Sequence, residues 1–166
     1  MSWPAVFVLG AGVAWLAAAT KLAIVDIRTR TLPTKLIWST AAAVWVLYAV
    51  ASLLRGDPSG LLGALAGAVA FSAPVFLIHF IHPPSMGFGD VRLCVLNGLV
   101  CGWWGWRVAL LAVSLSFLVA LPEALVVMVR HGARSSRPLG PYLAVGTAAG
   151  VVWAMTTWGI VPAGSS

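Results

Sequence analysis

The sequence predicts an all-α, polytopic membrane protein with six transmembrane helices, arranged as a single integral-membrane domain over residues 1–166. Hydrophobic residues make up 61% of the chain, charged residues make up only 8%, and the charges fall in short clusters between long apolar runs. A soluble domain has about 25% charged residues, so this chain has too few to cover its surface in water. We therefore expect a lipid bilayer to surround most of it.

A helix needs about 20 apolar residues to cross the hydrocarbon core of a membrane. Six apolar segments of the chain can do so, the fourth only just. We expect them at residues 4–25, 36–54, 61–81, 91–106, 108–129 and 139–161. The breaks follow in order: charges and Pro33 in 26–35, Asp57-Pro58 in 55–60, two prolines and two glycines in 82–90, a tight turn at Arg107, and basic residues in 130–138. No positive charge precedes the first run, which at about 20 residues is too long for the apolar region of a cleaved signal peptide.

The Lys and Arg residues predict the orientation, because positive residues stay on the cytoplasmic side of a membrane. The loops and helix ends on one side of the membrane hold eight of these residues: Lys21, Arg28, Arg30, Lys35, Arg92, Arg130, Arg134 and Arg137. The opposite side holds only Arg55 and Arg107. We predict that the side with eight is cytoplasmic and that both termini lie outside. The net charge of +6 then reflects topology, and no nucleic-acid partner is expected.

Two aspartates are expected at the cytoplasmic boundary: Asp26 at the end of the first helix and Asp90 at the start of the fourth. Ionisable groups near a span are costly and therefore candidates for function. Two carboxyls at one depth can form an aspartic dyad, in which an ionised Asp accepts a proton from water and a protonated Asp polarises the scissile carbonyl. The alternative is that each is an ordinary loop acid beside an arginine, Asp26 near Arg28 and Asp90 near Arg92.

The neighbourhood of Asp90 favours the first interpretation. Gly87 and Gly89 leave the backbone free of side chains, so an extended substrate strand could lie close to the acid. The dipoles of the two expected helices suggest a division of roles. A helix C-terminus disfavours negative charge and an N-terminus favours it, so Asp26 is predicted to be the protonated acid and Asp90 the ionised base, unless Arg28 and Arg92 overturn this.

Glu123 lies inside the fifth apolar segment and is a further candidate, since intramembrane acids are often functional. His79 is a plausible partner, and the alternative is that the two form a satisfied polar contact within the bundle. Cys94 and Cys101 form no CxxC pair and indicate neither a zinc site nor a disulfide framework. We expect no metal and no cofactor.

Three stretches of the chain resemble the type IV prepilin peptidases, a family of membrane aspartic proteases with a GxGD motif. The first is DIR at 26–28 followed by Leu-Pro at 32–33, similar to the family's D-x-R-x-x-x-I/L-P. The others are GFGDVRL at 87–93, continued by Gly98 and Gly102-Trp103, and RPLGPYLA at 137–144. The matching aspartates are catalytic in that family, so the resemblance implies catalytic Asp26 and Asp90. The candidates for substrate binding or support are Gly87, Gly89, Arg92, Arg28 and Glu123.

The chain departs from the family pattern in three places. Arg92 stands where Lys is usual, and Thr34 follows Pro33 where Asn is common. The third departure is that no long insertion with paired CxxC motifs follows the first helix. Bifunctional members have that insertion and also N-methylate the new terminus. The chain is therefore interpreted as a short-form enzyme with peptidase activity alone.

The resemblance implies an aspartic endopeptidase of the bacterial cytoplasmic membrane, acting at the cytoplasmic face on a prepilin or pseudopilin with a basic leader. A basic leader should be repelled by a face rich in Lys and Arg, although anionic lipids could mask this charge. Two alternatives remain open. One is a non-catalytic prepilin-binding assembly factor, and the other is a small membrane transporter or channel subunit, in which Glu123 could be an ion site.

Overall fold

The computed structural model describes residues 2–29, 32–81, 87–131 and 139–160, with side chains described except at 127–131. Within these ranges all regular structure is helical, which confirms the predicted all-α class. Arg30, Arg134 and Arg137, which contribute to the predicted charge bias, lie outside the described residues. The helices are α1 Trp3–Thr29, α2 Thr34–Arg55, α3 Ser59–Ile81, α4 Phe88–Gly102, α5 Trp106–His131 and α6 Gly140–Trp158.

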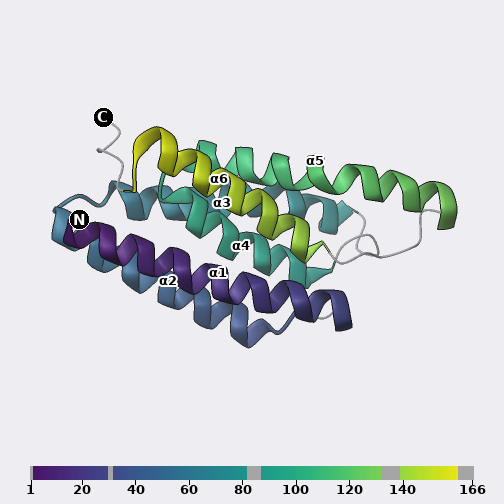
Figure 1. Ribbon diagram of the computed structural model, residues 1–166, viewed down its shortest axis with the longest axis horizontal. Helices are drawn as coiled ribbons and strands as arrows, with labels where there is room; N and C mark the ends of the chain where they lie inside the picture. Colours follow the sequence, from purple (N-terminus) through teal and green to yellow (C-terminus); the bar gives the residue numbers. More distant parts are fainter. Residues whose placement is uncertain (1, 30–31, 82–86, 132–138, 161–166) are drawn as a thin grey trace.

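Successive helices run in opposite directions along the bundle (Figure 1). As a result, α1 ends at the same end of the bundle at which α4 and α6 begin. We call this end the site end, and we call the end at which α1 begins and α6 ends the far end. The two predicted boundary aspartates, on α1 and α4, therefore lie at one end of the molecule.

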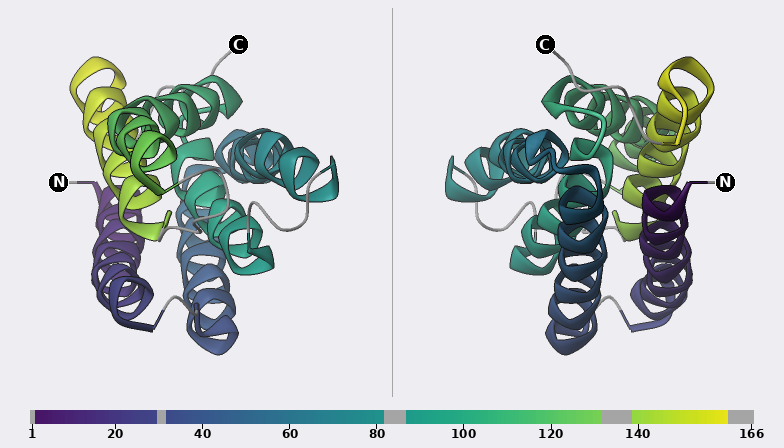
Figure 2. Two further views of the ribbon diagram at one scale, coloured as in Figure 1. Left: turned by 90° about the vertical axis from the view of Figure 1, so that its right-hand side faces the viewer. Right: turned by 90° about the vertical axis from the view of Figure 1, so that its left-hand side faces the viewer.

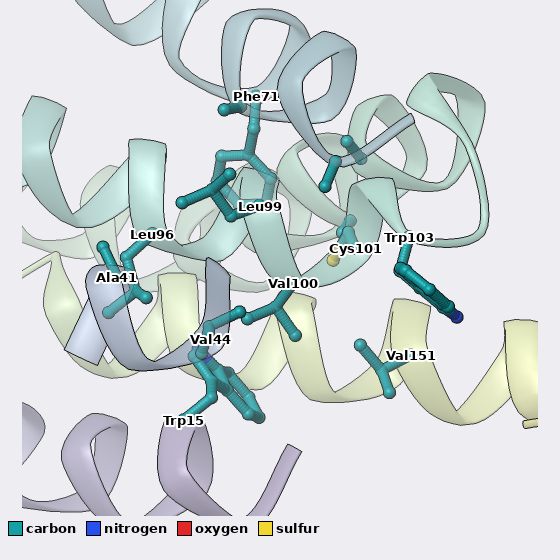
Figure 3. Close-up of a cluster of buried hydrophobic side chains, with 14 of the residues drawn as sticks. Trp15, Ala41, Val44, Phe71, Leu96, Leu99, Val100, Cys101, Trp103 and Val151 are labelled. Atoms are coloured by element: carbon teal, nitrogen blue, oxygen red, sulfur yellow. The ribbon is translucent and has the colours of Figure 1, made fainter. Parts of the chain in front are cut away.

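Helix α4 occupies the middle of the bundle and packs against all five other helices (Figure 2). Nearly every residue from Val91 to its last turn is buried, as expected for a helix that is surrounded by protein. Figure 3 shows how its side chains meet those of the other helices. The labelled residues are Leu96, Leu99, Val100 and Cys101 of α4 with Trp15, Ala41, Val44, Phe71, Trp103 and Val151.

Among the described helices, four are long and apolar enough to cross a membrane: α1, α2, α3 and the Trp106–Val126 part of α5. Helix α4 has 15 residues, about 22 Å at 1.5 Å per residue, which is shorter than a hydrocarbon core of about 30 Å. The fourth segment, which was expected only just to qualify, thus forms a helix too short to be among these four, and α6 is not among them either. Because its neighbours surround α4, the length of this helix does not have to match the lipid.

The tight turn predicted at Arg107 is wrong. Helix α4 ends at Gly102, and Arg107 lies in the first turn of α5. The turn is made instead around Gly105, whose φ of 110° favours glycine. Its amide donates to the Gly102 carbonyl at 2.8 Å. The two helices are therefore joined before the charged residue.

Helices α3 and α4 approach each other along glycines. A Cβ on Gly63 of α3 would lie 2.5 Å from the carbonyl oxygen of Gly102, and a Cβ on Gly67 would collide with the Gly102 Cα. On the α4 side, a Cβ on Gly98 would collide with the Gly67 carbonyl oxygen and lie 2.6 Å from the Ala68 Cα. Small residues allow helix backbones to pack this closely in membranes. These contacts fix α4 against its main neighbour.

We predict that Gly98→Ala destabilises the bundle. The added methyl meets the backbone of α3, which cannot rotate away, and overpacking of this kind lowers the free energy of unfolding by about 1–3 kcal/mol. Thermal unfolding in detergent measures the change. The control is Gly12→Ala in α1, where a Cβ would meet no atom within 4 Å. This variant should leave stability unchanged or raise it by about 0.5–1 kcal/mol. Equal effects of the two variants would contradict the close approach of α3 and α4.

Candidate active site

Asp26 lies one turn before the end of α1, and its side chain faces the start of α6. The residue is only 5% exposed. Its Oδ2 accepts a hydrogen bond from the backbone N–H of Gly140, the first residue of α6, at 2.9 Å. Asp26 is thus buried within the bundle and held by another helix, which an ordinary loop acid would not be.

Asp90 lies in the first turn of α4, beside the permissive backbone that precedes the helix. Its amide donates to the carbonyl of Gly87, the extended residue that directly precedes the helix, at 3.0 Å. Burial, and next the charge of Asp26, raise the pKa of Asp90 to about 6, although the Gly87 backbone acts in the opposite direction. The two carboxyls therefore lie close enough to influence each other's ionisation.

The arginines next to these acids in sequence have other surroundings. Arg28 is exposed. The Arg92 guanidinium donates to Thr34 Oγ1 at 2.6 Å and lies over the Phe88 ring, 4.7 Å from its centroid. Among the described residues, neither Asp26 nor Asp90 forms a salt bridge with an arginine. This disfavours the interpretation that each acid is neutralised by its neighbouring arginine.

The first two sequence motifs contact each other through the short connection between α1 and α2. A Cβ on Gly89 would lie 3.2 Å from the Leu32 Cβ. The hydrogen bond from Arg92 to Thr34, the first residue of α2, is a second link between the same segments. Gly89 therefore has a packing role against Leu32, whereas Gly87 remains exposed.

Glu123 and His79 lie on α5 and α3, and both are partly buried. The His79 ring lies 5.5 Å from the Phe88 ring, between centroids, so His79 adjoins the residue between the two glycines of the second motif. Sequence reasoning did not anticipate this contact. The predicted pairing of His79 with Glu123 stays a prediction.

Gly140 is the residue of the site that sequence reasoning missed, although it belongs to the third quoted motif. A Cβ at this position would lie 2.7 Å from Asp26 Oδ2, so the carboxylate occupies the space that a side chain would need. No residue type marks a backbone amide as a donor, which is why the motif alone gave no such role. The described residues contain no group of three or more His, Cys, Asp or Glu that could hold a metal ion.

Comparison with known proteins adds a family and three relatives. The type IV leader peptidase family matches residues 8–123, a range that includes both aspartates. The prepilin leader peptidase/N-methyltransferase of Stutzerimonas stutzeri is 27% identical over 155 residues, which cover 86% of this chain and 52% of that protein. Proteins of the same name from Pseudomonas putida and Pseudomonas aeruginosa are 31% identical over 99 residues and 29% over 96. These shorter matches cover 58% and 56% of this chain. The chain spans about half the length of the first relative and a third of the others. No solved structure matches it.

The raised pKa of Asp90 predicts how stability depends on pH. A carboxyl whose folded pKa of about 6 exceeds its ordinary value of 3.8 destabilises the fold when ionised. Its unfavourable contribution therefore grows as the pH rises from about 4 through 6. We expect Asp90→Asn to unfold at a higher temperature than wild type at about pH 7.5, and this gain to vanish near pH 4, in thermal unfolding in detergent.

Asp57 is the matched control, because its pKa is shifted in the opposite direction. Hydrogen bonds from the Ser59 hydroxyl and amide hold the pKa of Asp57 below its ordinary value. Asp57→Asn should therefore leave unfolding at about pH 7.5 unchanged or bring it to a lower temperature. A gain from Asp57→Asn as large as that from Asp90→Asn would indicate a general effect of removing an acid.

Proposed function

This chain belongs to the type IV leader peptidase family, and we propose that it is an aspartic endopeptidase that cleaves the basic leader from a prepilin or pseudopilin. The observation that carries the proposal is the meeting of Asp26 and Asp90 at the site end, where the charge of one raises the pKa of the other. The substrate class follows the names of the relatives, which are prepilin leader peptidase/N-methyltransferases. Family membership does not favour a transporter or channel subunit.

The proposed reaction uses one ionised and one protonated carboxyl. The oxygen of a water molecule adds to the scissile carbonyl carbon, one of its protons passes to the ionised carboxylate, and the protonated carboxyl gives its proton to the carbonyl oxygen. In the second step the C–N bond of the resulting gem-diol breaks. The leaving nitrogen takes the proton from the first carboxyl, and a diol hydroxyl returns a proton to the second. The products are an acid and an amine, and the dyad regains its starting state.

The start of α4 offers a place for the substrate backbone. Gly87 is exposed and extended, with φ −70° and ψ 144°, and it directly precedes the helix that carries Asp90. An extended peptide can pair with an exposed extended segment through main-chain hydrogen bonds. We propose that the segment around the scissile bond binds there, with the leader on the cytoplasmic side and the hydrophobic part of the substrate in the membrane.

Cleavage of a prepilin-like substrate co-expressed in membranes tests the dyad. We expect Asp26→Asn and Asp90→Asn each to reduce the cleavage rate by about 10²–10⁴-fold, the usual contribution of a proton-transfer group. The assay is a gel shift of the substrate, with insertion of each variant checked by membrane fractionation. Asp57→Asn, which changes an aspartate between α2 and α3, should cleave at the wild-type rate. Full activity in either of the first two variants would disprove the two-carboxyl reaction.

Glu123→Gln in the same assay decides whether the half-buried acid of α5 supports the reaction. A loss as deep as that of the aspartate variants would make Glu123 part of the reacting group. Binding of a prepilin by the wild-type protein without cleavage would instead favour the assembly-factor alternative.

We also propose that the site end faces the cytoplasm and that both termini lie outside. Eight of the 10 Lys and Arg residues are assigned to that side by the sequence, and α1 begins and α6 ends at the far end (Figure 1). Alkaline phosphatase joined after residue 166 should therefore be active, and a green fluorescent protein joined there should be dark. The converse pattern would place the two aspartates outside the cell.

A further inference from the structure

We propose that Asp26 holds the negative charge of the dyad, that Asp90 holds the proton, and that the backbone amide of Gly140 is the positioning group that keeps the charge on Asp26. The inference rests on the proposed function of the two aspartates and adds a third participant from α6. On the dipoles of α1 and α4 alone, Asp26 would be the protonated acid and Asp90 the ionised base, and the present proposal is the reverse.

The first step concerns the surroundings of the Asp26 carboxylate. Asp26 is buried, and a buried carboxylate stays ionised only where hydrogen bonds or positive charge compensate for lost water. The N–H of Gly140 provides a hydrogen bond of 2.9 Å to Oδ2, which compensates in part for the water lost on burial. Hydrogen bonds from an amide to an ionised acceptor are among the stronger ones in proteins.

The second step concerns the helix to which that amide belongs. Gly140 is the first residue of α6, and Leu139 before it has no side-chain hydrogen bond to cap the helix. The amides of a first helical turn lack partners within their own helix, and they form the positive end of its dipole. Asp26 therefore acts as the missing cap from another helix. This direct contact opposes the unfavourable dipole of α1.

The third step concerns Asp90, whose surroundings favour the proton. Its pKa is raised to about 6 by burial and by the charge of Asp26, and the Gly87 backbone only partly offsets these effects. Two adjacent carboxyls share one proton more readily than they both ionise. Once Asp26 is charged, Asp90 is therefore the group of the pair that keeps its proton to the higher pH.

Other ionisable groups lie on the helices packed against α1 and α4. They include the exposed Lys21 on α1 itself and, beside α4, the partly buried His79 of α3 and Glu123 of α5. Helix α1 packs against α2, α4 and α6. Near the site end its own Arg28 is exposed, as is Lys35 of α2, and Arg92 of α4 binds Thr34. The one ionisable side chain of α6 is Tyr142. Deeper in the bundle, α2 has Tyr48 and α4 has Cys94 and Cys101, and Arg55 of α2 lies at the far end.

The geometry also explains why position 140 carries glycine. A Cβ there would lie 2.7 Å from Oδ2, 3.3 Å from Cγ and 3.4 Å from Cβ of Asp26. Gly140→Ala would thus displace the Asp26 carboxylate from the amide. In the proposed reaction Asp26 is then the base that accepts the proton of water, and Asp90 gives its proton to the carbonyl oxygen.

The test is a titration of aspartate carboxyls by ¹³C NMR. The aspartates of the chain are Asp26, Asp57 and Asp90, so labelling the side-chain carboxyl of Asp gives a simple spectrum, assigned with the three Asp→Asn variants. In the wild-type protein in detergent, we expect Asp26 to become protonated at a lower pH than Asp90. Protonation of Asp26 at the higher pH would overturn the inference, and this measurement does not depend on any variant that might fail to fold.

Gly140→Ala then tests the positioning role. We expect it to raise the midpoint of Asp26 by about one pH unit or more and to lower kcat at least about tenfold, with KM little changed. Gly12→Ala, on the same helix as Asp26 but in open space, should alter neither. An unchanged Asp26 midpoint in Gly140→Ala would refute the role of the amide. The titration does not depend on cleavage, so the two proposals can fail separately. If Asp26 is protonated at the higher pH while Asp26→Asn and Asp90→Asn are both inactive, only this inference is refuted. Full activity of either variant would refute the dyad itself.

Discussion

The close approach of α4 to α3 is the packing contact on which the position of Asp90 depends. Carbonyl and Cα atoms of one helix occupy the space where side chains of the other would stand, at Gly67 and Gly102 among others. In lipid, helix association is driven by van der Waals packing of this kind, because lipid tails are as apolar as the side chains. The result is a short central helix enclosed by longer neighbours, which holds its first turn, and therefore Asp90, in a defined place.

A separate contact links the two helices that carry the aspartates. The Trp15 Nε1–H of α1 donates to Asn97 Oδ1 of α4 at 2.9 Å, with both residues buried. A polar side chain inside a membrane bundle needs such a partner. At the site end, the contact of Leu32 with Gly89 adds a link between α4 and the segment that joins α1 to α2. The relative placement of Asp26 and Asp90 is thus fixed by packing within the bundle and at its end.

The sequence predicted the helices and the common end of the two acids because hydropathy and charge act over whole segments. It placed the turn at Arg107 wrongly, since apolar tryptophans extend the hydrophobic pattern past the end of α4 and only the backbone of Gly105 reveals the turn. The partner of Arg92 was also beyond reach, because Thr34 belongs to another helix and adjacency in sequence suggested Asp90. The same limit applies to the amide of Gly140, which has no side chain to recognise.

The up-and-down topology gives these observations a common physical origin. At the site end, odd-numbered helices finish and even-numbered helices begin, so carbonyl groups and N–H groups without helical partners are brought together. A carboxylate on the last turns of α1 meets an unfavourable dipole in its own helix, and a neighbouring helix that starts at the same level can compensate with its N–H groups. Helix α6 does this for Asp26 without any basic side chain. The asymmetry proposed for the dyad therefore arises from the order of the helices, and it would be lost if α6 ended where it now begins.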